Sequence, residues 1–223
     1  MLLKIQKIKP KEKIKNIKNG SHILEEYSNK NLFKESNLFF DWYLSLFFNK
    51  KKASNIKKKA NKILRTLYKR LNFPNSHFVH RDYHAQNLMK VGKKIGIIDS
   101  QDALIGNAAY DLVSLVDDVR IKTSLNLKKQ IYNYYLKKTL KIYKINPTKF
   151  LEDFEILSVQ RSLKIIGIFS RLFIRDKKKQ YLRFIPYTWR LLEFRMKSEI
   201  FSELKKIFDS SDFKKLKTKS KFK

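Results

Sequence analysis

The sequence Val79-His-Arg-Asp-Tyr-His-Ala-Gln-Asn-Leu-Met89 decides the fold and the chemistry of this chain. Within it, Asp82 is followed five positions later by Asn87. A turn at Gly92 and a short apolar run then lead to Asp99. Two apolar runs on either side of a Gly-containing turn are typical of a β-hairpin. Such a hairpin would bring Asn87 and Asp99 side by side.

Asp82, Asn87 and Asp99 are the residue types that phosphoryl transfer needs. The reaction needs a carboxylate that orients the attacking hydroxyl and accepts its proton, and oxygen ligands that hold Mg²⁺ on the phosphates. Asp82 fits the first role, and Asn87 and Asp99 fit the second. The spacing therefore predicts a site where a metal-bound phosphate meets a hydroxyl group.

At these residues the sequence resembles the aminoglycoside-phosphotransferase-like branch of the protein-kinase-like fold. Residues 79–87 look like the catalytic loop of that family, and Asp99 stands where the family keeps its metal-binding Asp. Residues 98–106 and 110–115 are similar to the bacterial kinases that phosphorylate N-acetylmuramate and N-acetylglucosamine at the anomeric hydroxyl during cell-wall recycling. The likeness covers residues 32–187, with one departure: Ser100 replaces the aromatic residue that usually follows the metal-binding Asp.

The resemblance implies a reaction and roles for further residues. ATP would be the phosphoryl donor, Mg²⁺ the cofactor and a hydroxyl of an amino sugar the acceptor, in the cytoplasm. His80 would support the catalytic loop. Asp111 would anchor that loop by accepting backbone hydrogen bonds, although a carboxylate in the first turn of a helix is also stabilising by itself. Arg81 is expected to be a scaffold or surface residue.

Four further residues keep two interpretations each. His84 and Gln86 lie inside the loop and could face a sugar or the solvent. Asp102 could contact the sugar or a second metal ion, or it could cap a turn. Arg161 lies on an apolar helix stripe and is either paired with a carboxylate or anchors the substrate, and we favour the pair because a buried unpaired charge is costly.

Composition limits the partners. The chain has 51 Lys and Arg against 20 Asp and Glu, a formal net charge of +31 that could attract nucleic acid. Because the basic residues are mostly Lys and occur in every segment, we attribute the charge to composition and do not expect a nucleic-acid partner. The absence of Cys excludes disulfides. No stretch reaches the ~18 uncharged apolar residues of a membrane span.

Apolar periodicity predicts a mostly α-helical fold with a small β-hairpin, which the resemblance identifies as the carboxyl-terminal lobe of the protein-kinase-like fold. We expect a basic segment at 1–31, the kinase-like lobe at 32–208 and a disordered Lys-rich tail at 209–223. Helices are expected at 36–48, 50–71, 109–119, 124–143, 147–173 and 186–208. The residues before Leu32 contain no alternating strands and no Gly-rich loop, so we expect the amino-terminal lobe to be absent.

Three functions are compatible with these observations. The chain could be a kinase that works with a separately encoded amino-terminal lobe, or a truncated product of such a kinase. It could be a non-catalytic remnant that binds a sugar or another protein. It could also be a basic nucleic-acid-binding protein on a borrowed scaffold. We adopt the first hypothesis, with an amino sugar as the substrate.

Overall fold

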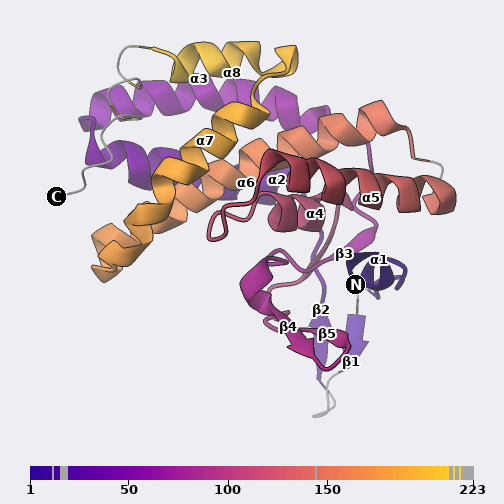
Figure 1. The fold of residues 1–223 in the computed structure, drawn as a ribbon. Coiled ribbons are helices and arrows are strands. Elements are labelled where there is room, and N and C mark those ends of the chain that lie inside the picture. The colour runs from indigo at the N-terminus through magenta and orange to yellow at the C-terminus, as the bar shows by residue number, and fades with distance from the viewer. Residues whose placement is uncertain (12, 16–19, 144, 211–212, 214–215, 217–223) are drawn as a thin grey trace. The chain divides into compact units, whose positions relative to one another are not determined.

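The computed structural model describes residues 1–11, 13–15, 20–143, 145–210, 213 and 216. The chain forms two compact units: residues 1–28 with 71–157 (unit 1), and residues 29–70 with 158–223 (unit 2). Helices predominate among the described residues, and the strands there form antiparallel pairs (Figure 1). The prediction of a mostly helical fold with a small β-hairpin is therefore confirmed, and its assignment to one lobe of a kinase stays a prediction.

Unit 1 contains every residue of the predicted site. Its described residues form three strand pairs, β1–β2, β3–β6 and β4–β5, each of two strands. Its elements are α1 (Leu2–Gln6), β1 (Lys13–Lys15), β2 (Ser21–Ile23), β3 (His77–Val79), a 3₁₀ turn (Ala85–Asn87), β4 (Leu88–Val91), β5 (Lys94–Ile97), β6 (Leu104–Gly106), α4 (Ala109–Val116), α5 (Leu125–Tyr143) and the first turns of α6 (Pro147–Asp176).

The predicted hairpin is present as β4 and β5. Its register places Leu88 opposite Ile97 and Val91 opposite Lys94. Gly92 makes the turn with φ of +57°, a left-handed backbone that Gly adopts without a steric penalty. The hairpin therefore follows from local sequence signals alone.

A buried carboxylate holds the entry to β3 against the segment before α4. Asp153 is fully buried and accepts the backbone N–H groups of Asn72 at 2.7 Å and Phe73 at 3.0 Å. It also accepts the side-chain amide of Asn107 at 2.6 Å, whose own oxygen accepts the N–H of Ala109 at 2.9 Å. These bonds fix where β3 and α4 begin.

Unit 2 is helical around an aromatic core. Its elements are α2 (Asn29–Leu38), a π-helical turn (Phe39–Tyr43), a 3₁₀ turn (Leu44–Leu46), α3 (Lys50–Lys69), the remainder of α6, a 3₁₀ turn (Lys179–Phe184), α7 (Ile185–Arg195), a 3₁₀ turn (Glu199–Phe201) and α8 (Ser202–Phe208). Helices α3 and α8 lie side by side (Figure 1). Trp189 donates to the Tyr43 hydroxyl at 3.0 Å, and burial raises the pKa of Tyr43 to about 12.

Several predicted helix ends agree with the structure. The helix predicted from residue 50 spans Lys50–Lys69, and the helix predicted from Pro147 spans Pro147–Asp176. Asn146 accepts the N–H of Lys149 at 3.1 Å, as a capping side chain does. Caps of this kind are local, so a sequence shows them.

Three predictions of local structure were wrong. The residues before Leu32 contain two paired strands, β1 and β2. The single helix expected over 186–208 is interrupted, because Ser198 has an extended backbone with ψ of 146° and a new helical run begins after it. The helix expected over 36–48 becomes π-helical from Phe39.

The predicted tail, residues 209–223, lies mostly outside the described residues. Of its later positions the structure describes Phe213 and Leu216, and both are buried. The predicted division into three segments stays a prediction. Among the described residues, no helix is both long and apolar enough to cross a membrane.

Gly167 of α6 is needed for the packing of unit 2. A Cβ at this position would lie 2.3 Å from the carbonyl carbon of Leu38 and 2.4 Å from the nitrogen of Phe39. We expect Gly167→Ala to destabilise the chain by about 1–3 kcal/mol through overpacking. Without the clash, the same change in a helix would stabilise by about 1 kcal/mol, so the sign of the effect is diagnostic.

The measurement is urea unfolding of the chain and the variant, followed by circular dichroism. Gly96→Ala is the control, because a Cβ there would meet nothing closer than 3.5 Å. A Gly167→Ala chain as stable as the parent, or more stable, would show that α6 does not pack against the backbone of residues 38–39.

Candidate active site

The loop from His80 to Asn87 connects β3 to the hairpin and carries Asp82. Asp82 itself is half-buried. Arg81 has φ of +70°, and Asp99, across the hairpin, has φ of +72°. Left-handed backbone at residues other than Gly costs roughly 1–3 kcal/mol and clusters at functional sites. The surrounding contacts must therefore hold both segments in place.

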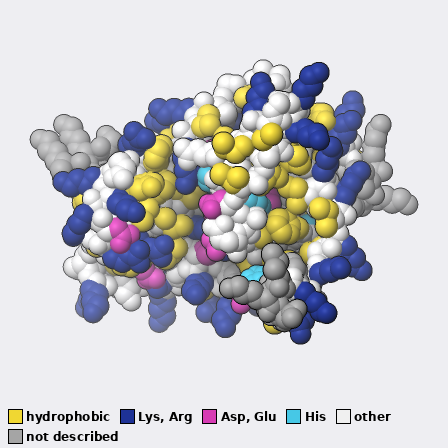
Figure 2. Space-filling view, turned by 90° about the horizontal axis from the view of Figure 1, so that it is seen from below, with side chains coloured by type: hydrophobic (Ala, Val, Ile, Leu, Met, Phe, Trp, Pro, Cys, Tyr) yellow, Lys and Arg dark blue, Asp and Glu magenta, His cyan; other side chains and the backbone are white. Residues whose placement is uncertain are grey.

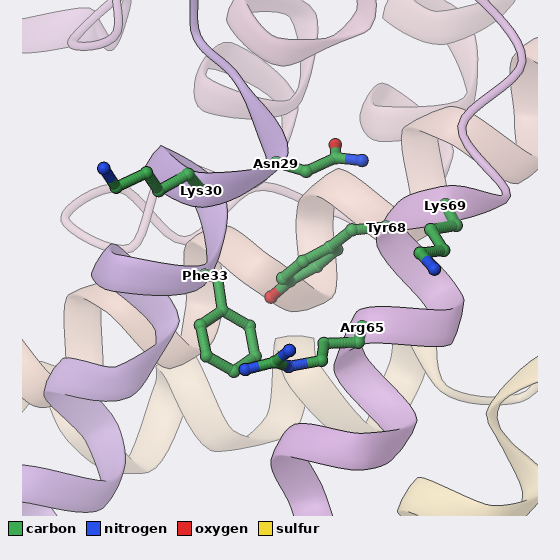
Figure 3. Close-up of a pocket in the computed structure, with 6 residues that line it drawn as sticks. All are labelled: Asn29, Lys30, Phe33, Arg65, Tyr68 and Lys69. Atoms are coloured by element: carbon green, nitrogen blue, oxygen red, sulfur yellow. The ribbon is translucent and has the colours of Figure 1, made fainter.

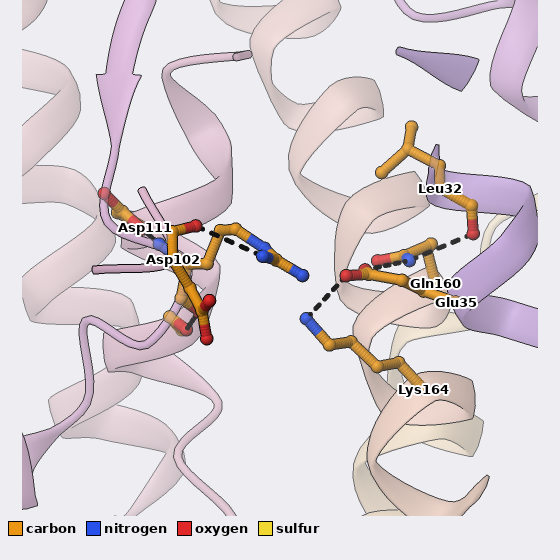
Figure 4. Close-up of polar contacts among 8 residues, drawn as sticks. Leu32, Glu35, Asp102, Asp111, Gln160 and Lys164 are labelled. Carbon is orange, nitrogen blue, oxygen red and sulfur yellow. Dashed lines mark hydrogen bonds and ion pairs between the residues drawn. The ribbon is translucent and has the colours of Figure 1, made fainter. Parts of the chain in front are cut away.

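Asp111, in the first turn of α4, holds the start of this loop (Figure 4). Its carboxylate is 1% exposed and accepts the backbone N–H of His80 at 2.7 Å and that of Arg81 at 3.0 Å. Ser114, one turn further along α4, donates its hydroxyl to the carbonyl of Arg81 at 3.1 Å. The strained backbone at Arg81 is thus bonded to α4 through both its N–H and its carbonyl.

His80 ties the loop to the end of the hairpin. Its Nε2 lies 3.0 Å from the carbonyl of Ile98, the residue before Asp99. The N–H of Ile98 donates to the carbonyl of Asn87 at 3.2 Å. Ile98 is therefore bonded to His80 through its carbonyl and to Asn87 through its N–H. These two bonds fix the position of the backbone directly before Asp99.

Asn87 and Asp99 form the predicted cation-binding part of the site. Asn87 is buried, and its amide nitrogen donates to the carbonyl of Asp82 at 3.0 Å. That bond leaves the amide oxygen, the atom that could bind a cation, for another partner. Asp99 is exposed, and one carboxylate oxygen accepts the side-chain amide of Gln101 at 3.0 Å.

This donor set suits Mg²⁺. Both donors are oxygens, and Mg²⁺ usually takes one or two protein carboxylates and completes its shell with water and phosphate oxygens. Within the described ranges, no group of three or more His, Cys, Asp or Glu side chains could hold a metal ion by itself. Two oxygen donors suit an ion whose remaining positions are filled by water and phosphate oxygens.

The predicted substrate contacts lie in different environments. His84 is buried, and its N–H donates to the carbonyl of Asp82 at 2.9 Å, whereas Gln86 is exposed. Asp102 is exposed and accepts the Arg81 guanidinium through its backbone carbonyl at 3.1 Å (Figure 4). Arg81 is thus bonded within the scaffold. Contact of His84, Gln86 or Asp102 with a substrate stays a prediction.

Tyr83 is held in its neutral form. Burial raises its pKa to about 12, the negative charge of Asp111 adds to this, and a hydrogen bond to the backbone of Leu2 opposes it. Burial likewise lowers the pKa of His77 on β3, which favours the neutral imidazole. Neither side chain brings a charge to the residues next to Asp82.

The sequence analysis missed an exposed apolar surface on the hairpin. Strand pairing puts Met89 and Val91 on one face of β4, and the exposed Ile98 directly follows β5, with its N–H bonded to the carbonyl of Asn87. Met89 is 48% exposed, Val91 62% and Ile98 50%. Large apolar side chains this exposed, beside a predicted metal ligand, are typical of a ligand-contacting surface. The alternation of apolar residues in β4 was the available signal.

Arg161 lies in unit 2 and is buried. On the same stretch of α6, an ion pair joins Lys164 to Glu35, with Nζ 2.9 Å from Oε1. Gln160 donates to the other oxygen of Glu35 at 3.1 Å and to the carbonyl of Leu32 at 3.2 Å (Figure 4). This cluster joins α6 to α2, and the predicted carboxylate partner of Arg161 stays a prediction.

A pocket of about 310 Å³ in unit 2 contains none of the predicted site residues. It lies between α2 and α3. There the guanidinium carbon of Arg65 lies 5.0 Å from the centre of the Phe33 ring (Figure 3). It is lined by Asn29, Lys30, Phe33, Arg65, Tyr68 and Lys69. The residues predicted for catalysis therefore lie on the loop and hairpin of unit 1, outside this pocket.

Figure 2 shows Lys and Arg side chains exposed on one face of the described residues. Lys and Arg side chains are scattered around that face, and acidic, His and hydrophobic side chains occur among them.

Comparison with known proteins gives a consistent result. The sequence profile of the phosphotransferase enzyme family matches residues 26–144, which include the whole loop and hairpin. The chain is 34% identical to the N-acetylmuramate/N-acetylglucosamine kinase of Neisseria meningitidis over 167 residues, 74% of this chain and 50% of the relative. It is 33% identical to the protein of that name from Pseudomonas aeruginosa over 180 residues, 77% of this chain and 52% of the relative.

A third relative with the same name, from Caulobacter vibrioides, is 34% identical over 137 residues, 59% of this chain and 37% of the relative. The chain thus spans about half the length, or less, of these curated relatives. The residues that the family profile matches, 26–144, contain the loop, the hairpin and α4.

Proposed function

Because the chain belongs to the phosphotransferase enzyme family, we propose that it carries the catalytic loop and metal-binding hairpin of a kinase. The reaction is transfer of the γ-phosphoryl group of ATP to a hydroxyl of an amino sugar. The observation that carries this proposal is the bonding of Asn87 to Asp82 and to Ile98, which brings the loop and the start of Asp99 together.

Asp82 acts as the residue that receives the acceptor hydroxyl. Its carboxylate orients that hydroxyl and takes its proton as the phosphorus–oxygen bond forms. The carbonyl of Asp82 is bonded by Asn87 and by the N–H of His84. Because these bonds hold the backbone of Asp82, its carboxylate extends toward the acceptor from a fixed position.

Asn87 and Asp99 would hold Mg²⁺, Asn87 through its amide oxygen and Asp99 through its carboxylate. The ion would neutralise charge on the phosphates and orient them. Within the protein, the contribution of this pair is a fixed spacing, because Asn87 and Ile98 are joined by a backbone hydrogen bond. His80 and Asp111 support the loop on which the pair depends.

The exposed apolar face of the hairpin receives the nucleotide base. A purine has two apolar faces, and the exposed Met89 and Ile98 lie near the metal ligands along the chain. Gly96, opposite Met89, leaves that face of the hairpin without a side chain at its middle. A flat ring could therefore approach the strand backbone closely at this point.

The amino-sugar acceptor is taken from the names of the relatives, which are N-acetylmuramate/N-acetylglucosamine kinases. We place the reaction in the cytoplasm, in the recycling of cell-wall sugars. A polypeptide segment that supplies the remaining part of the relatives' length, with further contacts to the nucleotide, is part of the proposal. The alternative is a remnant that binds the sugar without transferring phosphate.

The test is an assay of phosphate transfer from γ-labelled ATP to N-acetylmuramate or N-acetylglucosamine, with and without Mg²⁺. The chain is assayed alone and together with a polypeptide that completes the relatives' length. We expect Mg²⁺-dependent labelling of the sugar in at least the second mixture. Sugar binding by calorimetry without labelling in either mixture would support the remnant and refute the kinase.

A further inference from the structure

Asp118 is a buried carboxylate that no part of the proposed reaction uses. It lies two positions after the end of α4 and is 2% exposed. One oxygen accepts the backbone N–H of Ala85 at 3.1 Å, and the other accepts the N–H of Arg120 at 2.9 Å. Both oxygens are thus used by backbone donors, and one of these donors belongs to the catalytic loop.

The bonded position in the loop is the start of a 3₁₀ turn. Ala85 begins the turn that ends at Asn87, and His84 before it has extended backbone without a side-chain cap. The first N–H groups of a helical turn have no partner inside the turn, and a carboxylate is their strongest acceptor. Asp118 supplies that acceptor from 33 residues away.

Asp111 and Asp118 lie seven positions apart and bond to the loop on opposite sides of Asp82. Asp111 holds the two residues before Asp82, and Asp118 holds the third residue after it. Asp111 lies in the first turn of α4 and Asp118 lies two positions beyond its end, so the loop is attached at both ends of this helix. Helix α4 is therefore a brace along the loop.

The far end of this brace is itself fixed. Lys128 of α5 is 3% exposed and donates to the carbonyl of Val116, the last residue of α4. Its ammonium group also lies 3.2 Å from a carboxylate oxygen of Asp117. Because the carbonyl groups at a helix end attract a cation, Lys128 holds the segment from which Asp118 projects.

We propose that Asp118 is a positioning residue for phosphoryl transfer, which acts by fixing the 3₁₀ turn that carries Asn87. This inference rests on the proposed function. Within the turn, the N–H of Asn87 donates to the carbonyl of His84 at 3.0 Å, and its side chain donates to Asp82. Loss of the Asp118 bond would free the turn, and with it the relative position of the metal ligand and the residue that receives the hydroxyl.

The variant is Asp118→Asn, which keeps the size of the side chain and can accept from only one of the two N–H groups. Amide hydrogen exchange of the full chain, followed by NMR, is expected to be about tenfold faster at Ala85, the effect of losing about 1.4 kcal/mol of local stabilisation. In the mixture that transfers phosphate, kcat should fall about 10–100-fold, because a misplacement of about 1 Å can cost 10². KM for ATP should change less than about twofold, since the variant removes no contact to the nucleotide.

Glu35→Gln is the control, a largely buried carboxylate of unit 2 that is bonded by Lys164 and Gln160 and has no part in the proposed reaction. It should lower the melting temperature comparably and leave exchange at Ala85 and kcat near the parent values. Unchanged exchange at Ala85 in Asp118→Asn would overturn the inference, as would faster exchange with unchanged kcat. If the parent chain transfers no phosphate in any mixture, the proposed function fails, and exchange at Ala85 still decides whether Asp118 holds the loop.

Discussion

Asp82→Asn is expected to lower kcat for phosphoryl transfer by about 10²–10⁴-fold, the usual contribution of a positioned general base. The amide keeps the size of the carboxylate but cannot accept the proton of the attacking hydroxyl. KM for ATP should be little changed, because the contacts that hold Asn87 come from the backbone of Asp82 and from Ile98. The measurement is steady-state transfer of labelled phosphate to the sugar.

Asp176→Asn is the control for a general effect of charge. Asp176 lies in unit 2 in an ion pair with Arg175, with Nε 2.7 Å from Oδ1, and it has no proposed role. Its replacement should leave kcat within about twofold. An Asp82→Asn chain that retained more than about a tenth of the parent rate would remove Asp82 from the role of base.

The part of the site that a sequence can predict is the part built from neighbours. Asn87 and Asp99 are joined by a four-residue strand, a Gly turn and a second strand, and each of these has a local signature. The backbone hydrogen bonds between β4 and β5 then bring Asn87 and Asp99 close together. The hairpin and the helix starts at Lys50 and Pro147 were predicted for the same reason.

The contacts that hold the loop have no local signature. Asp111 bonds to residues 30 and 31 positions away, and Asp118 to one 33 positions away. Resemblance to a family pointed to Asp111, whereas nothing in the run Asp117-Asp118 distinguishes a loop-holding carboxylate from an ordinary helix end. Only the fold shows which donor each oxygen meets.

The two strands before Leu32 were missed for a related reason. Lys13–Lys15 and Ser21–Ile23 are short and rich in polar residues, and the described side chains of β2 are exposed. An exposed strand of three residues has no alternation of apolar and polar positions to detect. Its pairing is decided by its neighbour, which periodicity within one segment cannot reveal.

Asp111→Ala is expected to destabilise unit 1 by about 2–6 kcal/mol, because two buried N–H groups would each lose an acceptor at about 1–3 kcal/mol. The same change should release the left-handed backbone at Arg81, so transfer should fall even in the folded fraction. Because whole-domain stability is about 5–15 kcal/mol, the Ala variant can leave little folded protein. Asp111→Asn, which can still accept one N–H, keeps the test interpretable at a cost of about 1–3 kcal/mol.

The measurement is the shift of the urea midpoint, with Ser114→Ala as the graded control. Ser114 donates one neutral hydrogen bond to the carbonyl of Arg81, so its loss should cost only about 1 kcal/mol. If Asp111 anchors the loop, Asp111→Ala destabilises the chain most, Asp111→Asn less and Ser114→Ala least. A free energy of unfolding of Asp111→Ala within about 0.5 kcal/mol of the parent value would mean that neither N–H depends on this carboxylate. Helix α4 would then not hold the loop at His80 and Arg81.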